Sequence, residues 1–276
     1  MNTTGRVDRT MSVQQIKAFG VSESCQRLEQ YLHQVGYAPG TIQQRMYRLN
    51  SLGVPPEEAT RDDVLAALPA DAKPSTKRVY LSALSASFRD LITMGICDHD
   101  PTLGIRIPGF HRGLPRPLPP AVLTALVGAQ GTERDWTVMG VYAGLRASDT
   151  AALYADDLVE TDRGMAISLE GKGGVKALVP AHPLVIEIMQ RGRPRGPLWR
   201  ITPGALSTRW AGWALALVDQ RFRYHQCRHS FATRVYEACG QDLLITRDLM
   251  RHRSVATTQI YAQADQSRGY RAVAGL

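Results

Sequence analysis

The feature that most constrains this chain is a segment rich in proline and glycine, PTLGIRIPGFHRGLPRPLPP, at residues 101–120. Proline fixes its own φ angle and lacks an amide hydrogen, so such a run forms neither a regular helix nor a central strand. We interpret residues 106–119 as a linker. It divides a chain of 276 residues, long enough for two cores, into an N-terminal domain at 13–105 and a C-terminal domain at 120–276. Residues 1–12 are expected to form a flexible arm.

The N-terminal domain is predicted to be a small helical domain. Its apolar residues recur at helical spacing, and no strand signal is present. Ser22, Thr41 and Thr60 stand where helices should begin, and Pro74 opens a longer helix. Four or five short helices around one core are typical of a compact helical bundle.

The C-terminal domain is predicted to be mainly helical with one small antiparallel sheet. Helical patterns cover residues 120–130 and 133–154. Residues 165–180 differ, because two short apolar segments flank Gly171-Lys172-Gly173-Gly174, which indicates a β-hairpin. The predicted fold class is therefore mostly α, with a helical N-terminal domain and a mainly helical second domain.

The charge of the chain favours a polyanionic partner. Lys and Arg number 33 against 25 Asp and Glu, a formal net charge of +8. Residues 1–112 carry 13 basic against 11 acidic residues, and the rest carries 20 against 14. A basic surface attracts nucleic acid, although a merely soluble basic protein explains the charge equally well.

Cysteine usage and hydropathy indicate a cytoplasmic protein. Cys25, Cys97, Cys227 and Cys239 form no C-x-x-C pair, which is typical of reduced thiols. No apolar run is long enough to span a membrane, and the polar N-terminus lacks the apolar core of a signal peptide. We expect no membrane partner.

Arg146 stands in the segment YAGLRASD, after an apolar helix and a Gly-Leu pair, where a helix is expected to end or bend. An arginine is costly to bury there unless an anion meets it. Two interpretations stay open. Its planar fork can grip a phosphate with two hydrogen bonds, or it can form an ion pair with Asp149 three residues on.

Three further residues have chemistry that suits a phosphate. Lys172 lies at the hairpin tip, where it can swing into a neighbouring site and give a proton to a leaving oxygen, although most exposed hairpin lysines do not. His225 and Arg228 are three residues apart, so they project from one helix face. They combine a group that titrates near neutral pH with a permanent cation.

A zinc site is the rival interpretation of the same segment. His225, Cys227, His229 and Cys239 are possible ligands. His225 and Cys227 are only two positions apart, however, so they face apart on a helix. Cys227 and Phe231 are better interpreted as core residues.

A tyrosine near the end of a basic helical stretch, Tyr261, and a histidine nine positions earlier, His252, are unremarkable alone. Together with the residues above they form an ordered set that resembles the signature of tyrosine recombinases of the phage-integrase type. The set is Arg146, Lys172, His225, Arg228, His252 and Tyr261. The segments YAGLRASD, GKGGVKALVP, CRHSFATRVYEACG and TTQIY resemble the family's local motifs, and the resemblance runs from about residue 14 onward.

The resemblance implies a Xer- and Cre-like plan of two domains without an arm-binding domain. Residues 13–105 would be a SAM-like core-binding domain and residues 120–276 the catalytic domain. Tyr261 would attack a DNA phosphate after His225 takes its proton, giving a 3′-phosphotyrosine link. Arg146 and Arg228 would hold the non-bridging oxygens.

The two remaining positions of the set would assist this reaction. Lys172 would protonate the leaving 5′ oxygen, and His252 would bond to the phosphate or position the tyrosine. The link conserves bond energy, so rejoining to a partner strand needs no ATP. The implied mechanism also needs no metal ion, and no cofactor is expected.

The expected partner is double-stranded DNA. The protein would be a monomer in solution and would assemble as a homo-tetramer on two duplexes. The tail after Tyr261 would pack on a neighbouring protomer, or alternatively be disordered. A directionality factor is a possible further partner. The expected function is integration or excision of a phage or mobile element through a Holliday junction, in a bacterial or phage-infected cytoplasm. The alternatives are a Xer-like chromosome or plasmid dimer resolvase, a type IB topoisomerase-like strand transferase, and a non-catalytic DNA-binding protein.

The sequence departs from the family pattern at Arg251, where Gly is usual, and at Asp149 and Cys227, where Glu and Leu are usual. The Arg251 side chain is expected to point away from the site or to touch DNA. We expect DNA contacts at basic residues of the helical domain, the linker and this position. These are Arg45, Lys77, Arg78, Arg106, Arg112, Arg116 and Arg251.

Overall fold

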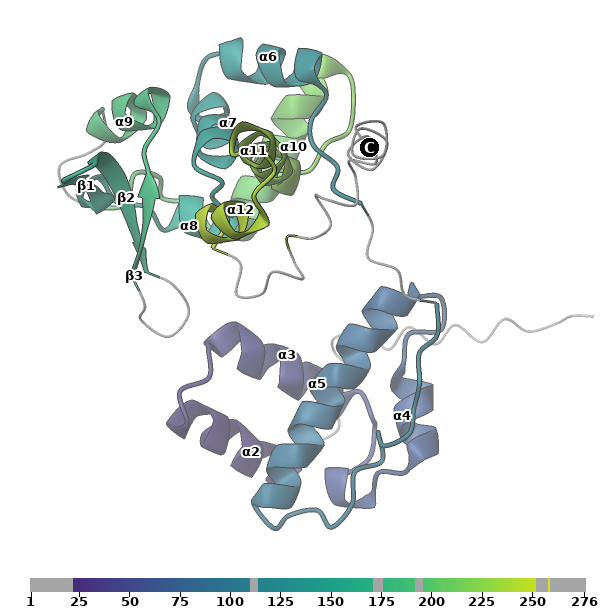
Figure 1. Ribbon diagram of the computed structural model, residues 1–276. Helices are drawn as coiled ribbons and strands as arrows, with labels where there is room; N and C mark the ends of the chain where they lie inside the picture. The colour runs from purple at the N-terminus through teal and green to yellow at the C-terminus, as the bar shows by residue number, and fades with distance from the viewer. Residues whose placement is uncertain (1–21, 110–113, 171–175, 192–195, 252–257, 259–276) are drawn as a thin grey trace, which may run out of the picture. The chain divides into compact units, whose positions relative to one another are not determined.

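The computed structural model describes residues 22–109, 114–170, 176–191, 196–251 and Thr258. The chain divides into two compact units, residues 1–111 and 112–276 (Figure 1). The expected arm at 1–12 and the tail after Tyr261 lie outside the described residues. Within the described ranges, no helix combines the length and the apolar character that crossing a bilayer requires.

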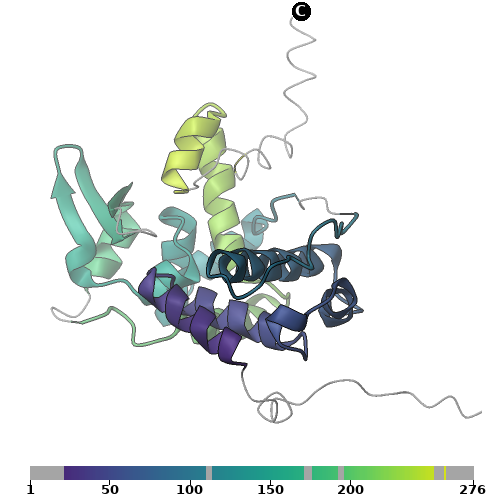
Figure 2. The same ribbon diagram turned by 90° about the horizontal axis from the view of Figure 1, so that it is seen from below.

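Unit 1 is helical throughout its described residues. Its elements are α2 (Glu23–Gln34), α3 (Pro39–Asn50), the short 3-10 helix η1 (Pro56–Glu58), α4 (Arg61–Ala67) and α5 (Pro74–Thr93). Helices α2, α3 and α5 pack against one another (Figure 2). Their shared core includes Leu28, Leu32, Leu84 and Phe88, all fully buried.

Helix starts in unit 1 follow local chemistry. The Ser22 hydroxyl accepts a hydrogen bond from the Cys25 backbone amide at 3.3 Å. Thr60 forms a capping box with Asp63. Both predicted N-caps are therefore confirmed. The prediction for Thr41 is wrong. Helix α3 already begins at Pro39, because proline has the φ angle of a first helical residue and needs no amide partner there.

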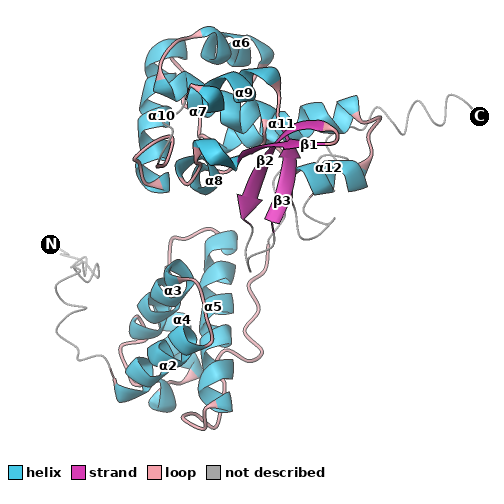
Figure 3. Cartoon of the chain, turned by 90° about the vertical axis from the view of Figure 1, so that its left-hand side faces the viewer, coloured by secondary structure: helices cyan, strands magenta, loops and turns pink. Residues whose placement is uncertain are grey.

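In unit 2 a small sheet lies at one edge of a group of helices (Figure 1 and Figure 3). Its elements are α6 (Pro120–Gly128), α7 (Thr132–Tyr142), α8 (Ala147–Ala151), the 3-10 helix η2 (Ala155–Asp157), β1 (Leu158–Thr161), β2 (Gly164–Glu170), β3 (Lys176–Pro180), α9 (Pro183–Gln190), α10 (Pro203–Val218), α11 (His225–Ala238) and α12 (Leu243–Leu249). The predicted fold class, mostly helical with a small antiparallel sheet, is confirmed.

The sheet contains the predicted hairpin and one strand more. The strands have the order β1-β2-β3 and are antiparallel, with Ile167 opposite Val179. Strand β1 was not predicted, because its four residues, LVET, are too short to show a clear alternation.

The helical pattern over residues 133–154 is interrupted just before Arg146, where the sequence predicts an end or a bend. Helix α7 ends at Tyr142, and α8 begins only after Arg146. Between them Gly144 has a φ of +61°, a left-handed conformation that interrupts a helix. A Cβ atom at residue 144 would also overlap the Phe231 ring of α11, so the turn brings the backbone close to that helix.

The predicted linker is attached to the units at both of its described ends. Ile105 and Ile107 pack on the core of unit 1, and the Arg78 guanidinium donates to the Ile107 carbonyl at 2.7 and 3.0 Å. Leu118 is buried in unit 2, where its amide donates to the Ser230 hydroxyl at 2.8 Å.

Candidate active site

Arg228 connects three segments of unit 2. It lies on the first turn of α11 and is only 1% exposed. Its Nη1 donates to the carbonyl of Gly144, in the turn before α8, and its Nη2 donates to the carbonyl of Met250, at the end of α12. Backbone carbonyls satisfy a guanidinium's N–H groups without cancelling its charge, so these two contacts preserve a positive site.

Arg146 is the more accessible of the two predicted phosphate-binding arginines. It is the N-cap of α8, and 41% of its side chain is exposed. Its Nη1 lies 3.7 Å from the Asp149 Oδ2, too far for a hydrogen bond. The predicted ion pair with Asp149 is therefore present but loose, and the guanidinium faces solvent.

The Asp149 carboxylate accepts hydrogen bonds from two other donors. Its Oδ2 accepts the Arg146 backbone amide at 3.1 Å and the Arg251 Nη2 at 2.8 Å. Burial alone would raise the pKa of Asp149, but the charge of Arg251 and the Arg146 amide outweigh it and hold that pKa below its usual value. The carboxylate therefore stays ionised beside the site.

Arg251 contradicts the expectation that its side chain points away from the site. Arg251 directly follows Met250, the C-cap residue of α12. Its own φ is +52°, a backbone conformation that costs a non-glycine residue about 1–3 kcal/mol. Only 14% of its side chain is exposed, and it reaches Asp149 across 102 residues of sequence. This pairing also argues against Arg251 as a DNA contact.

His225 is the first residue of α11 and lies near Arg228 and Arg146. Burial is the largest cause that lowers its pKa, and the charges of Arg228 and Arg146 lower it further. The structure thus brings Arg146, His225 and Arg228 together, as the sequence predicted. A histidine kept neutral in this way has a ring nitrogen able to accept a proton near pH 7.

His229 packs against His225 one turn later on α11. The ring centroids are 4.8 Å apart, and the rings meet edge to face. Burial, followed by the neighbouring His225 and Arg228, lowers the pKa of His229 to about 4. His229 is therefore an uncharged packing partner of His225 at neutral pH.

Tyr224 holds this arrangement together, and sequence reasoning missed it. Its buried hydroxyl donates to the Trp136 carbonyl at 2.9 Å and receives the Thr150 hydroxyl at 2.8 Å. The bonds fasten α8, which follows Arg146, to α7 and to the start of α11. Burial raises the pKa of Tyr224, so it is a structural phenol. No local pattern could have revealed partners 74 and 88 residues away.

Cys227 and Phe231 belong to the core, as predicted. Cys227 is fully buried where α11 crosses α7, and a Cβ atom on Gly140 would lie 2.5 Å from its own. Burial raises the pKa of the Cys227 thiol, which disfavours the thiolate that a zinc ligand requires. The other three predicted catalytic positions, Lys172, His252 and Tyr261, lie outside the described residues.

Comparison with known proteins decides the family. Residues 129–268 match the phage integrase family. Tyrosine recombinase XerC of Pseudomonas fluorescens is 31% identical, over 67% of this chain and 68% of that protein. The chain belongs to the phage integrase family of tyrosine recombinases. It is therefore a site-specific DNA recombinase.

Other relatives of the recombinase cover more of its length. Tyrosine recombinase XerD of Pseudomonas aeruginosa is 29% identical over 81% of this chain and 82% of its own. A lambda integrase dimer bound to a COC′ core site has a TM-score of 0.63 at 18% identity, covering 86% of this chain and 75% of the other. XerH bound to difH substrate, before cleavage, has a TM-score of 0.59 at 18% identity, covering 90% and 84%. These structural likenesses show the fold.

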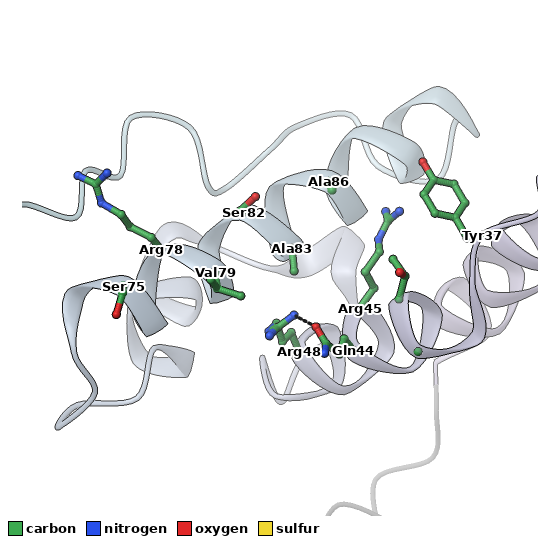
Figure 4. Close-up of a pocket in the computed structure, with 12 residues that line it drawn as sticks. Tyr37, Gln44, Arg45, Arg48, Ser75, Arg78, Val79, Ser82, Ala83 and Ala86 are labelled. Atoms are coloured by element: carbon green, nitrogen blue, oxygen red, sulfur yellow. Dashed lines mark hydrogen bonds between the residues drawn. The ribbon is translucent and has the colours of Figure 1, made fainter. Parts of the chain in front are cut away.

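Unit 1 of the recombinase carries a basic groove between α3 and α5, about 600 Å³ in volume (Figure 4). Three arginines contribute to its wall, Arg45, Arg48 and Arg78, and no acidic side chain is among the described residues that line it. The remaining lining is small or polar, including Ser75 and Ser82. Arg48 and Arg78 supply the positive charge of the groove, because Arg45 is paired with Asp90.

Arg45 does not fit its predicted role as a DNA contact. It is only 4% exposed, and its guanidinium bonds to the Asp90 carboxylate at 2.6 Å and the Ser87 hydroxyl at 3.1 Å. Its charge is neutralised inside unit 1, which makes it a structural residue.

The other predicted DNA contacts differ in accessibility. Lys77 is half-buried, and its amine donates to the Ala70 carbonyl at 2.8 Å, whereas Arg78 is exposed although it also bonds to the Ile107 carbonyl. Arg106 and Arg116 are exposed on either side of residues 110–113. Arg112 lies outside the described residues.

Proposed function

We propose that this recombinase cuts and rejoins double-stranded DNA through a 3′-phosphotyrosine link at Tyr261. The observation that carries the proposal is the meeting of Arg146 and Arg228 at one histidine, His225, whose pKa they help to lower. Two guanidinium groups beside a neutral imidazole suit a reaction at an anionic phosphate with a phenol nucleophile.

Each group has a defined task in the proposed step. Arg146 faces solvent and can bind a non-bridging oxygen of an arriving phosphate. Arg228 is buried and contributes positive charge to the same site. The Tyr261 oxygen attacks phosphorus, the bond to the 5′ oxygen breaks, and the phenol proton passes to His225. This division fits a base that is uncharged before the reaction.

Lys172 and His252 complete the proposed set. Lys172 supplies the proton that the leaving 5′ oxygen takes up, and His252 donates a hydrogen bond to the phosphate or positions the tyrosine. A 5′ hydroxyl on a partner strand then reverses the step and releases Tyr261. The rejoining needs no external energy, because the phosphotyrosine bond preserves that of the phosphodiester.

We further propose that unit 1 is a core-binding domain and unit 2 the catalytic domain, with DNA held partly by the basic groove of unit 1. A lambda integrase tetramer bound to a Holliday junction has a TM-score of 0.62 with this chain at 19% identity, covering 84% of this chain and 76% of the other. That likeness supports a homo-tetramer on DNA, and we propose that it assembles on two duplexes from monomers in the cytoplasm. A directionality factor would choose between integration and excision.

Integration of a phage or mobile element is the favoured role. Resolution of chromosome or plasmid dimers is the second candidate, because the relatives named above include proteins called XerC and XerD. The two roles share the chemistry at Tyr261, and they differ in the DNA sites that are joined.

The test is covalent trapping on a nicked DNA substrate that contains the recombination site. The short 5′-hydroxyl fragment diffuses away after cleavage, so the enzyme accumulates on the DNA. We expect wild-type protein to form the adduct and mass spectrometry to map it to Tyr261. Tyr261→Phe should bind the same DNA without forming any adduct. An adduct formed by Tyr261→Phe would overturn the assignment of the nucleophile.

A further inference from the structure

Three N–H groups compete for one oxygen of Asp149. The Arg251 Nη2 lies 2.8 Å from Oδ2, the Arg146 backbone amide lies 3.1 Å from it, and the Arg146 Nη1 lies 3.7 Å from it. Hydrogen bonds from nitrogen to oxygen are 2.7–3.2 Å long, so the first two are formed and the third is not. Of the three, the Arg146 guanidinium is thus the group that forms no hydrogen bond to this oxygen.

Removal of Arg251 would change that competition. Asp149 is only 20% exposed, and a carboxylate in such a place gains free energy by finding a cation. The nearest remaining cation is Arg146, three residues away on the same turn and within 1 Å of hydrogen-bond length. A short rotation of its side chain would close the ion pair and turn its donors away from an arriving phosphate.

The backbone conformation of Arg251 indicates that its side chain has a functional or structural role. Its φ of +52° is the conformation that glycine adopts most easily at the end of a helix, and the family commonly has glycine here. An arginine in this conformation is strained, and strain in a non-glycine residue points to a compensating role of the side chain. The only hydrogen bond that the described structure records for this side chain is the one to Asp149.

We propose that Arg251 is a positioning residue, which occupies the Asp149 carboxylate and so keeps the Arg146 guanidinium available to the scissile phosphate. Its action is indirect, because its side chain bonds to the Asp149 carboxylate and affects Arg146 through that carboxylate. The turn that carries it is anchored to the site, since the preceding carbonyl, that of Met250, accepts the Arg228 Nη2. This inference rests on the proposed function of Arg146.

The test is a double-mutant cycle on the full chain, read as the single-turnover rate of adduct formation at saturating nicked DNA. Arg251→Gly should lower the rate about tenfold or more, a fraction of the 10²–10³-fold that losing a charge-stabilising donor costs. Asp149→Asn, which keeps an oxygen for the Arg146 amide, should stay within about threefold of wild type. The double variant Arg251→Gly/Asp149→Asn should recover to the rate of Asp149→Asn, because no carboxylate remains to capture Arg146.

Two further variants separate this role from folding and from net charge. Glycine is favoured at this φ, so Arg251→Gly should melt within a few degrees of wild type, and its affinity for DNA should change little. Arg251→Lys, which keeps a cation for Asp149, should retain most of the rate. Arg247→Ala is the matched control: it removes the same charge from α12, where Arg247 pairs with the adjacent Asp248 at 2.6 Å. It should form the adduct at the wild-type rate.

The inference is overturned if the double variant is as slow as Arg251→Gly, since the loss would then not pass through Asp149. It is also overturned if Arg251→Gly forms the adduct as fast as wild type. Failure of the wild-type protein to form any adduct would instead reject the proposed function, so the two outcomes are distinguishable.

Discussion

Each unit of the described chain buries an arginine, and the partners of the two differ. Arg45 in unit 1 bonds to a carboxylate, that of Asp90, at 2.6 Å. Arg228 in unit 2 directs its two terminal nitrogens to backbone carbonyls, those of Gly144 and Met250. A carboxylate cancels the charge of a guanidinium, whereas carbonyl dipoles only satisfy its N–H groups.

Because backbone carbonyls leave the charge of Arg228 in place, this charge affects the pKa values of neighbouring histidines. The charge of Arg228 helps to lower the pKa of both His225 and His229, after burial as the main cause. Its field is therefore present in the site, where a phosphate would meet it. The two buried arginines of the described chain thus differ in the groups that receive these hydrogen bonds, although both are buried.

The largest expected effect is on catalysis, from matched substitutions at the two arginines. Arg228→Lys and Arg45→Lys both keep the charge and lose the planar fork. Arg228→Lys should lower the single-turnover rate of adduct formation about 10²-fold or more, because one ammonium cannot bridge two carbonyls and serve the phosphate. Arg45→Lys should change the rate at saturating DNA by less than about threefold. Equal losses in the two variants would contradict the distinction.

The next effect is on the stability of unit 1. Arg45→Met leaves Asp90 without its cation and should lower the free energy of unfolding by about 3 kcal/mol, the low end for breaking a buried pair, because Asp90 keeps some exposure. The double variant Arg45→Met/Asp90→Leu should regain most of that loss, since an apolar pair leaves no buried charge.

The measurement must separate the two units. All four tryptophans, Trp136, Trp199, Trp210 and Trp213, lie in unit 2, so their fluorescence reports on that unit. Hydrogen exchange in peptides from α3 and α5 reports on unit 1. If Arg45→Met left exchange in these helices unchanged, or if the double variant were no better than the single, the structural role of Arg45 would be refuted.

The smallest expected effect is the response of the two units to acid. The folded-state pKa of His229 is lowered to about 4, so below about pH 6.5 the unfolded chain binds a proton that the folded chain does not. Unit 2 should therefore lose stability as the pH falls from 7 to 5. In unit 1 the pKa of His99 is raised, mainly by its hydrogen bond to Asp98, so its small contribution is present in acid and is lost as the pH rises.

Thermal melts followed by tryptophan fluorescence at pH 7 and pH 5 check this prediction. This window lies above the range in which Asp149 takes up a proton, so histidines dominate the change. His229→Gln should reduce the difference between the two melting temperatures. An unchanged or larger difference in that variant would show that His229 is not the group responsible.

Much of the fold was predictable because it depends on local chemistry. Caps at Ser22 and Thr60 and the β2–β3 hairpin follow from residue type and spacing over a few positions. Near Arg146 the sequence indicated an end or a bend, but not that Gly144 adopts a left-handed turn next to a ring from α11. A helical pattern on both sides of a glycine does not reveal such a distant contact.

The sequence by itself determined the mostly helical fold class with its small sheet. It also predicted which residues act on a phosphate and where the chain divides, since these predictions depend on residue type and local spacing. Only the tertiary structure decided what each arginine bonds to. Asp149 and Arg251 are 102 residues apart, and Arg45 and Asp90 are 45 apart. The free energy of a buried charge depends on the atoms within a few ångströms of it, and folding alone brings those atoms together.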